Sequence, residues 1–203
     1  MMAVAASIAA GLLYPAIEGR FGPVGDIAAK GLGVAALAVA ATMAGRWWLA
    51  AIMAAGALGD VLLELPNGLI AGGAAFAAGH AIAIVFYGRN RRPALNRQAW
   101  MRAAALVGYG AAMPALVLRA VAVPETIYAV LLCGMAAAAW LSRFPRRWAA
   151  LGAMLFVVSD TLLMMRMGGR YFGGPGVHGL LVWYFYYLGQ LGIFIGVSLG
   201  MRR

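Results

Sequence analysis

The chain has 203 residues, of which 65% are hydrophobic and only 11% are charged. A soluble globular domain carries about 25% charged residues, so too few polar side chains remain here to cover a water-facing surface. The net charge of +10 does not indicate nucleic-acid binding, because the arginines lie in short gaps between apolar runs and form no continuous basic face. The composition predicts an all-α, polytopic membrane protein.

Eight apolar runs approach the length of about 20 residues that a helix needs to cross a bilayer. Prolines such as Pro93 and Pro145 fall in the gaps between these runs. The first run resembles the apolar region of a signal peptide, but no Lys or Arg precedes it, so it is interpreted as a retained helix. In a single transmembrane domain over residues 1–203, the predicted spans are 2–18, 27–44, 47–65, 68–88, 100–119, 124–142, 147–166 and 178–200.

Basic residues are distributed unequally between the two ends of the predicted helices. With eight spans both termini lie on one side, and eleven arginines fall on that side against four on the other. Because cytoplasmic loops carry the excess of Lys and Arg, both termini are predicted to be cytoplasmic, in a bacterial inner membrane. Tryptophans that fit an interfacial belt lie near the same ends: Trp47, Trp48, Trp100, Trp140 and Trp148.

Two stretches that are 100 residues apart share a pattern. An arginine and a tryptophan precede the segment Leu-Gly-Asp-Val-Leu-Leu at 58–63, and the same residue types precede Val-Ser-Asp-Thr-Leu-Leu at 158–163. The pattern favours two parallel four-helix repeats, residues 1–98 and 99–203, and the alternative is coincidence in a chain rich in Ala and Leu. In either case Asp60 and Asp160 lie at matching depths of the third and seventh spans.

Ionisable residues within the spans are the first candidates for function, because a charge in hydrocarbon is costly. Of the six acids in the chain, Asp60 and Asp160 lie about 6–9 Å inside the outer boundary, counted along an α-helix. Each is expected to be paired, hydrogen-bonded or protonated. Glu64 shares a helix face with Asp60, and it either tunes that residue or is a charge at the membrane rim.

Lys30 and the two histidines are the basic residues considered next. Lys30, the only lysine, lies near the outer start of the second span, where it pairs with a carboxylate, holds a phosphate, or snorkels to the interface. His80, in the fourth span, is either a site residue or a packing group. His178, at the start of the last span, is expected at the surface.

Polar aromatic residues cluster in the last span. Tyr186 and Gln190 share a helix face at the spacing i, i+4. Together with Tyr187 and with Tyr128 of the sixth span, they either support a site or belong to an interfacial belt, although Gln190 lies too deep for a belt.

Several chemistries are not available to this chain. Two histidines and one cysteine cannot make a three-histidine or cysteine-rich zinc site, and neither GxxxxGK[ST] nor GxSxG occurs. A mixed Asp/His metal site is an alternative that the spacing does not support, and we expect no metal and no cofactor. The remaining carboxylates, with Lys, His, Tyr and Gln around them, suit general acid–base catalysis or the movement of a proton-coupled solute.

The sequence resembles the YhhN family of membrane proteins, whose characterised members are lysoplasmalogenases. Two positions depart from the family pattern: Gly31 replaces the usual proline after the lysine, and Ile82–Ile84 precede the aromatic residues expected soon after the histidine. The resemblance rests on Lys30, the 58–63 segment, Phe76 with Gly79 and His80, Tyr128, Ser159 and Asp160 with Leu162 and Leu163, and Tyr186–Gln190.

The resemblance implies hydrolysis of the vinyl ether bond of a lysophospholipid, a lysoplasmalogen, to a fatty aldehyde and a glycerophospho-base. Asp60 and Asp160 are then the expected catalytic pair. The expected supporting residues are Lys30, Glu64, His80, Tyr128, Tyr186, Tyr187 and Gln190. The alternatives are a small proton-coupled transporter, which accumulates a solute without releasing aldehyde, and a non-catalytic lipid-binding protein, in which Asp→Asn substitutions are silent.

Overall fold

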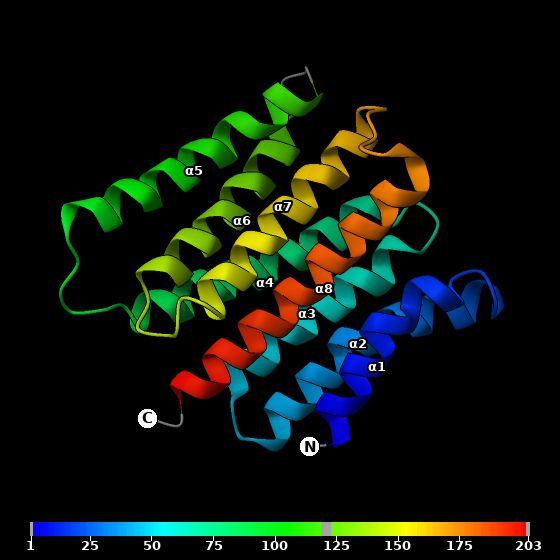
Figure 1. The fold of residues 1–203 in the computed structure, drawn as a ribbon, viewed down its shortest axis with the longest axis horizontal. Coiled ribbons are helices and arrows are strands. Elements are labelled where there is room, and N and C mark those ends of the chain that lie inside the picture. The colour runs from blue at the N-terminus through cyan, green and yellow to red at the C-terminus, as the bar shows by residue number, and fades with distance from the viewer. Residues whose placement is uncertain (1, 119–122, 202–203) are drawn as a thin grey trace. The chain divides into compact units, whose positions relative to one another are not determined.

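The computed structural model describes residues 2–118 and 123–201. Within these ranges the chain forms eight α-helices and no strand, which confirms the predicted fold class. The helices, shown in Figure 1, are α1 (Met2–Ile17), α2 (Gly22–Met43), α3 (Trp47–Leu63), α4 (Leu69–Arg89), α5 (Arg97–Leu118), α6 (Val123–Leu141), α7 (Ala149–Met167) and α8 (Gly174–Gly200).

Six helices in the described part of the chain, α2 and α4 to α8, are long and apolar enough to cross a membrane. The apolar helices α1 and α3 are shorter, with 16 and 17 residues. A helix of this length extends about 25 Å, slightly less than the hydrocarbon thickness of about 30 Å, and local thinning of the bilayer accommodates such a mismatch. The chain is a multi-pass membrane protein.

The largest differences from the predicted starts are at α2 and α8, which begin five and four residues early. α2 begins at Gly22 and α8 at Gly174, and each has a proline in its first turn. Proline is well tolerated there, because the N–H group it lacks would have no helical partner and its fixed φ suits a helix. The prediction counted these prolines as parts of loops and therefore placed both helix starts too late.

The chain divides into two compact units, residues 1–82 and 83–203, and the division falls within α4. In the first unit α2 packs against both α1 and α3. The hydroxyl of Ser7 on α1 donates a hydrogen bond of 2.6 Å to the carbonyl of Gly33 on α2. This contact satisfies a buried polar side chain within the apolar bundle.

In the second unit α7 contacts α5, α6 and α8, and α5 runs beside α6 (Figure 1). The backbones of α7 and α8 approach closely at small residues. A Cβ atom on Gly152 would lie 2.7 Å from the carbonyl oxygen of Gly189 and from the amide nitrogen of Ile193. Small residues permit this approach, which is a main source of helix association in lipid.

Gly152→Ala is expected to destabilise the protein by about 1–3 kcal/mol, because the added methyl group meets backbone atoms that cannot move aside without separating α7 from α8. Thermal unfolding of the purified protein in detergent measures the effect. The matched control is Gly108→Ala on α5, where an added Cβ meets no atom within 4 Å. Equal unfolding midpoints for the two variants would contradict the close packing of α7 on α8.

Candidate active site

Asp60 lies near the end of α3 and is only 2% exposed. Its neighbour Gly59 packs against the ring of Phe76 on α4, so closely that a Cβ atom on this glycine would lie 2.6 Å from the ring. One turn earlier on α3, Ala55 lies against Gly79. Small residues thus bring α4 close to the part of α3 that carries Asp60.

His80 follows Gly79 on α4 and is 4% exposed, so it lies inside the first unit. Since α3 and α4 are antiparallel, with Phe76 beside Gly59 and Gly79 beside Ala55, the level of His80 is about 8 Å from that of Asp60 along the helix axis. The structure places both side chains in the interior of the same unit.

Lys30 on α2 forms an ion pair and a hydrogen bond with Glu64, the C-terminal capping residue of α3. The side chains are 19% and 36% exposed, so the pair lies at the partly accessible end of these helices. The structure therefore brings Lys30 to Glu64, and the interpretation of Glu64 as a rim charge agrees with its exposure.

Asp160 lies within α7 and is 5% exposed. The hydroxyl of Tyr128, from α6, donates a hydrogen bond to its carboxylate. The preceding residue, Ser159, donates a hydrogen bond of 2.7 Å to the carbonyl of Val182 on α8. The carboxylate is thus held by α6, while the adjacent hydroxyl fixes α7 against α8.

Tyr186 and Tyr187 of α8 lie inside the protein. Tyr186 is 6% exposed and Tyr187 is fully buried, with its ring stacked on Trp183 at a centroid distance of 6.3 Å. The amide of Gln190 donates a hydrogen bond of 3.4 Å to the hydroxyl of Tyr186, as the i, i+4 spacing predicted. The ring of Tyr186 also contacts Phe156 on α7, one turn before Asp160 on the same helix face.

The expectation that His178 lies at the surface is wrong, because its side chain is fully buried. The backbone N–H of Phe172 donates a hydrogen bond of 2.9 Å to Nδ1 of this imidazole. The other ring nitrogen, Nε2, lies 2.8 Å from the carbonyl oxygen of Leu162 on α7. His178 therefore ties the α7–α8 connection to both of its helices.

The candidate residues fall into two sets. Asp60, Lys30, Glu64 and His80 belong to the first unit, and the other candidates, with Asp160, belong to the second. Contacts join Lys30 with Glu64, Tyr128 with Asp160, and Tyr186 with Gln190. Across the described ranges, no three His, Cys, Asp or Glu side chains are grouped so that they could hold a metal ion.

The helices define an integral membrane protein with buried polar side chains in each of its two units. The model of the YhhN family matches residues 25–197, a range that includes every candidate residue above, and the chain belongs to this family. Proteins named lysoplasmalogenase from Mycobacterium bovis and Mycobacterium tuberculosis are each 29% identical to it over 164 residues. The aligned region covers 76% of this chain and 62% of each relative, so the chain spans less than two thirds of their length. No solved structure matches the chain.

His178→Ala is expected to lower the free energy of unfolding by about 1–3 kcal/mol, because it leaves a buried backbone donor and a buried carbonyl without partners. His178→Asn, which retains an acceptor near the position of Nδ1, is expected to lose less. Chemical denaturation in detergent compares the two variants. Wild-type stability in the alanine variant would contradict the structural role of this imidazole.

Proposed function

We propose that this protein hydrolyses the vinyl ether bond of a lysoplasmalogen within the membrane and that Asp60 and Asp160 carry out the acid–base chemistry. The observation that carries the proposal is the presence of one buried aspartate in each unit, on α3 and on α7. Carboxylates inside membrane-spanning helices are costly and therefore indicate function. The relatives named lysoplasmalogenase support the choice of substrate.

The reaction requires one acid and one base. Protonation of the outer vinyl carbon converts the C=C–O group into an oxocarbenium ion. Water adds to this cation and loses a proton, which gives a hemiacetal. Collapse of the hemiacetal breaks the C–O bond and releases a fatty aldehyde and the hydroxyl group of the glycerophospho-base. The proton consumed in the first step is regained in the second, so the overall reaction consumes only water.

Two aspartates in different surroundings are suited to these steps. One remains protonated until it delivers its proton to carbon, and the other remains charged, stabilises the cation and accepts a proton from water. A similar division of roles between two carboxyl groups operates in glycoside hydrolysis. Tyr128 orients the carboxylate of Asp160 through its hydrogen bond. Tyr186 and Gln190, joined to each other on α8, orient water or the glycerol.

The substrate has a single chain, which enters from the lipid between helices that expose mainly small and apolar side chains. Lys30 recognises the phosphate by exchanging its partner Glu64 for the headgroup at the partly exposed end of α3. In this arrangement both termini lie in the cytoplasm of a bacterium, because the arginine-rich loops remain on that side.

Asp60→Asn and Asp160→Asn are each expected to lower kcat/KM for aldehyde release from lysoplasmalogen by at least about 100-fold, because general acid–base catalysis contributes about 10²–10⁴-fold. The assay uses the purified protein in mixed micelles. Asp26→Asn is the matched control, since Asp26 lies near the start of α2 and accepts a long, exposed hydrogen bond of 3.5 Å from the amide of Phe21.

Near-wild-type activity in either variant would remove that aspartate from the mechanism. A wild-type protein that releases no aldehyde but accumulates a solute in proteoliposomes would favour the transporter instead. If the wild type and both aspartate variants behave alike and none of them releases aldehyde or accumulates a solute, a non-catalytic lipid-binding protein would be favoured.

Tyr128→Phe is expected to lower kcat about tenfold, because a hydrogen bond to a charged group contributes about 1.5–3 kcal/mol. The pH dependence of kcat should also change, since the variant removes a polar partner of Asp160. The matched control is Tyr109→Phe on α5, whose hydroxyl contacts Thr161 and not an acid. A Tyr128→Phe profile that overlays the wild type would show that this hydroxyl has only a packing role.

A further inference from the structure

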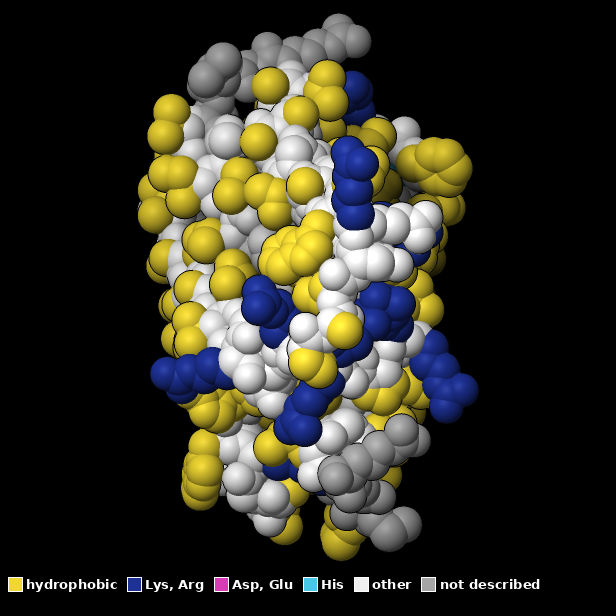
Figure 2. All heavy atoms as spheres, turned by 90° about the vertical axis from the view of Figure 1, so that its left-hand side faces the viewer, with side chains coloured by type: hydrophobic (Ala, Val, Ile, Leu, Met, Phe, Trp, Pro, Cys, Tyr) yellow, Lys and Arg dark blue, Asp and Glu magenta, His cyan; other side chains and the backbone are white. Residues whose placement is uncertain are grey.

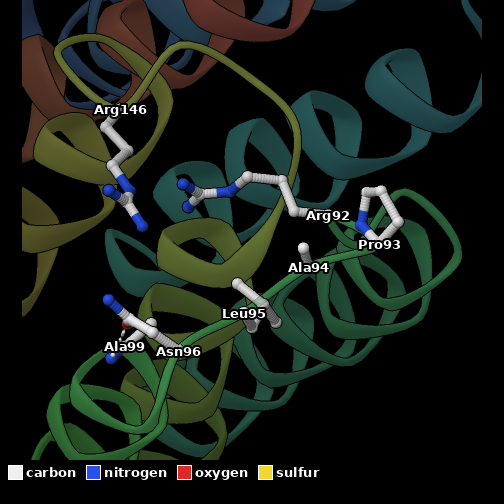
Figure 3. A pocket seen from close by; sticks show the side chains of 7 residues that line it. All are labelled: Arg92, Pro93, Ala94, Leu95, Asn96, Ala99 and Arg146. Atoms are coloured by element: carbon white, nitrogen blue, oxygen red, sulfur yellow. Dashed lines mark hydrogen bonds between the residues drawn. The ribbon is translucent and has the colours of Figure 1, made fainter.

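A hollow of about 620 Å³ lies in the second unit, where the ends of its helices meet the connecting loops. Figure 3 shows its lining, which comes from the α4–α5 loop, the start of α5 and the α6–α7 loop: Arg92, Pro93, Ala94, Leu95, Asn96, Ala99 and Arg146. Asp160 lies about 17 Å further along α7 from the first residue of this helix, counted at 1.5 Å per residue. The hollow is therefore separate from the proposed catalytic residues of this unit.

Backbone hydrogen bonds join the two loops that line the hollow. The amide of Arg92 donates to the carbonyl of Leu141 at 3.1 Å, and the amide of Arg143 donates to the carbonyl of Asn90 at 2.8 Å. The guanidinium of Arg92 then donates to the carbonyl oxygens of Ser142 and Trp140. Arg92 is thus fixed in place and is not a freely moving surface charge.

Arg146 meets Arg92 at the same place. Its guanidinium lies 4.4 Å from the centre of the Trp140 ring, and its Nε donates a long hydrogen bond of 3.4 Å to the carbonyl of Trp140. Figure 3 shows the two guanidinium groups directed toward one another across the hollow. Burial and the charge of Arg146 both lower the pKa of Arg92, as expected for two cations held close together.

No acid in the surrounding sequence offsets these charges. Segments 89–102 and 141–148 contain eight arginines and no Asp or Glu. On the face drawn in Figure 2, Lys and Arg side chains gather among hydrophobic ones, and no acidic side chain of the described residues is in view. Two fixed cations without a counter-ion are unfavourable, and a bound anion would relieve their repulsion.

The start of α5 adds backbone N–H groups and the positive end of a helix dipole to the hollow. The side chain of Asn96 accepts a hydrogen bond of 2.9 Å from the amide of Ala99, which caps this 22-residue helix. Both residues line the hollow, so the positive end of the helix dipole lies beside the two arginines. Backbone amides at a helix start and bidentate guanidinium groups are both well matched to phosphate oxygens.

We propose that this hollow binds the phosphate of an anionic phospholipid headgroup. Arg92 and Arg146 contact the phosphate oxygens, and the first turn of α5 faces the same group. A lipid is favoured over free phosphate because Pro93, Ala94 and Leu95 line the hollow and Trp100, 47% exposed, follows Ala99 in the first turn of α5, where an acyl chain would pass. Basic pockets between membrane helices bind anionic headgroups in this way.

Native mass spectrometry of the full-length protein with added short-chain phosphatidylglycerol tests the proposal. Arg92→Gln/Arg146→Gln is expected to weaken binding at least tenfold. The matched control, Arg97→Gln/Arg147→Gln, removes the same charge at the first residue of α5 and in the α6–α7 loop, outside the hollow, and it should remain within twofold of the wild type. Equal loss in both double variants would overturn the proposal.

Arg92 also binds two backbone carbonyls, so its replacement tests folding as well as binding. The single variant Arg146→Gln, compared with Arg147→Gln, avoids this difficulty and is expected to weaken lipid binding at least threefold. A separate experiment measures the binding of inorganic phosphate alone. If phosphate saturates the protein at the same concentrations as the lipid, the acyl chain adds no affinity. That result would overturn the assignment to a lipid.

Discussion

The cost of placing a carboxylate in a membrane-spanning helix governs much of this structure. An unpaired charge in such surroundings costs several kcal/mol, so an acidic side chain must lie inside the protein and have polar partners. Asp60 and Asp160 are both almost fully buried. Around Asp160 the requirement is met by the hydroxyl of Tyr128. The small residues that let α7 approach α8, and α4 approach Gly59, form the apolar surroundings in which these acids lie.

The free-energy cost of burying a charge also divides the charged residues of this chain into two groups. The buried acids are few and held by specific partners, which suits chemistry that needs one protonated and one charged carboxyl group. The arginines lie at the helix ends, where they stack on aromatic rings and bind carbonyl oxygens, as Arg92 and Arg146 do around Trp140. In the proposed function the buried acids act on the vinyl ether of a lysoplasmalogen and Lys30 binds its phosphate, while Arg92 and Arg146 hold the headgroup of a separate lipid.

Much of this architecture could be predicted from the sequence, because eight apolar runs separated by loop residues predict the eight helices that the described residues form. The starts of α2 and α8 were missed because prolines that occupy first helical turns were counted as loop residues. The burial of His178 depends on how the 168–173 segment folds back, and positive φ angles at Gly169 and Gly173 permit that turn. The pairing of Tyr128 with Asp160 depends on which faces of α6 and α7 meet, which periodicity in a uniformly apolar helix does not reveal. The internal repeat and the shared action of the two aspartates remain predictions.

The most direct test of shared action is the double variant Asp60→Asn/Asp160→Asn, with kcat/KM for lysoplasmalogen cleavage compared with both single variants. Residues that act in one catalytic unit lose activity non-additively, so the second substitution removes little once the first is present. The double variant is expected to retain the activity of the slower single variant within about threefold. Losses that multiply, so that the double variant falls by the product of the two single effects, would show that the aspartates act independently and would contradict the central claim.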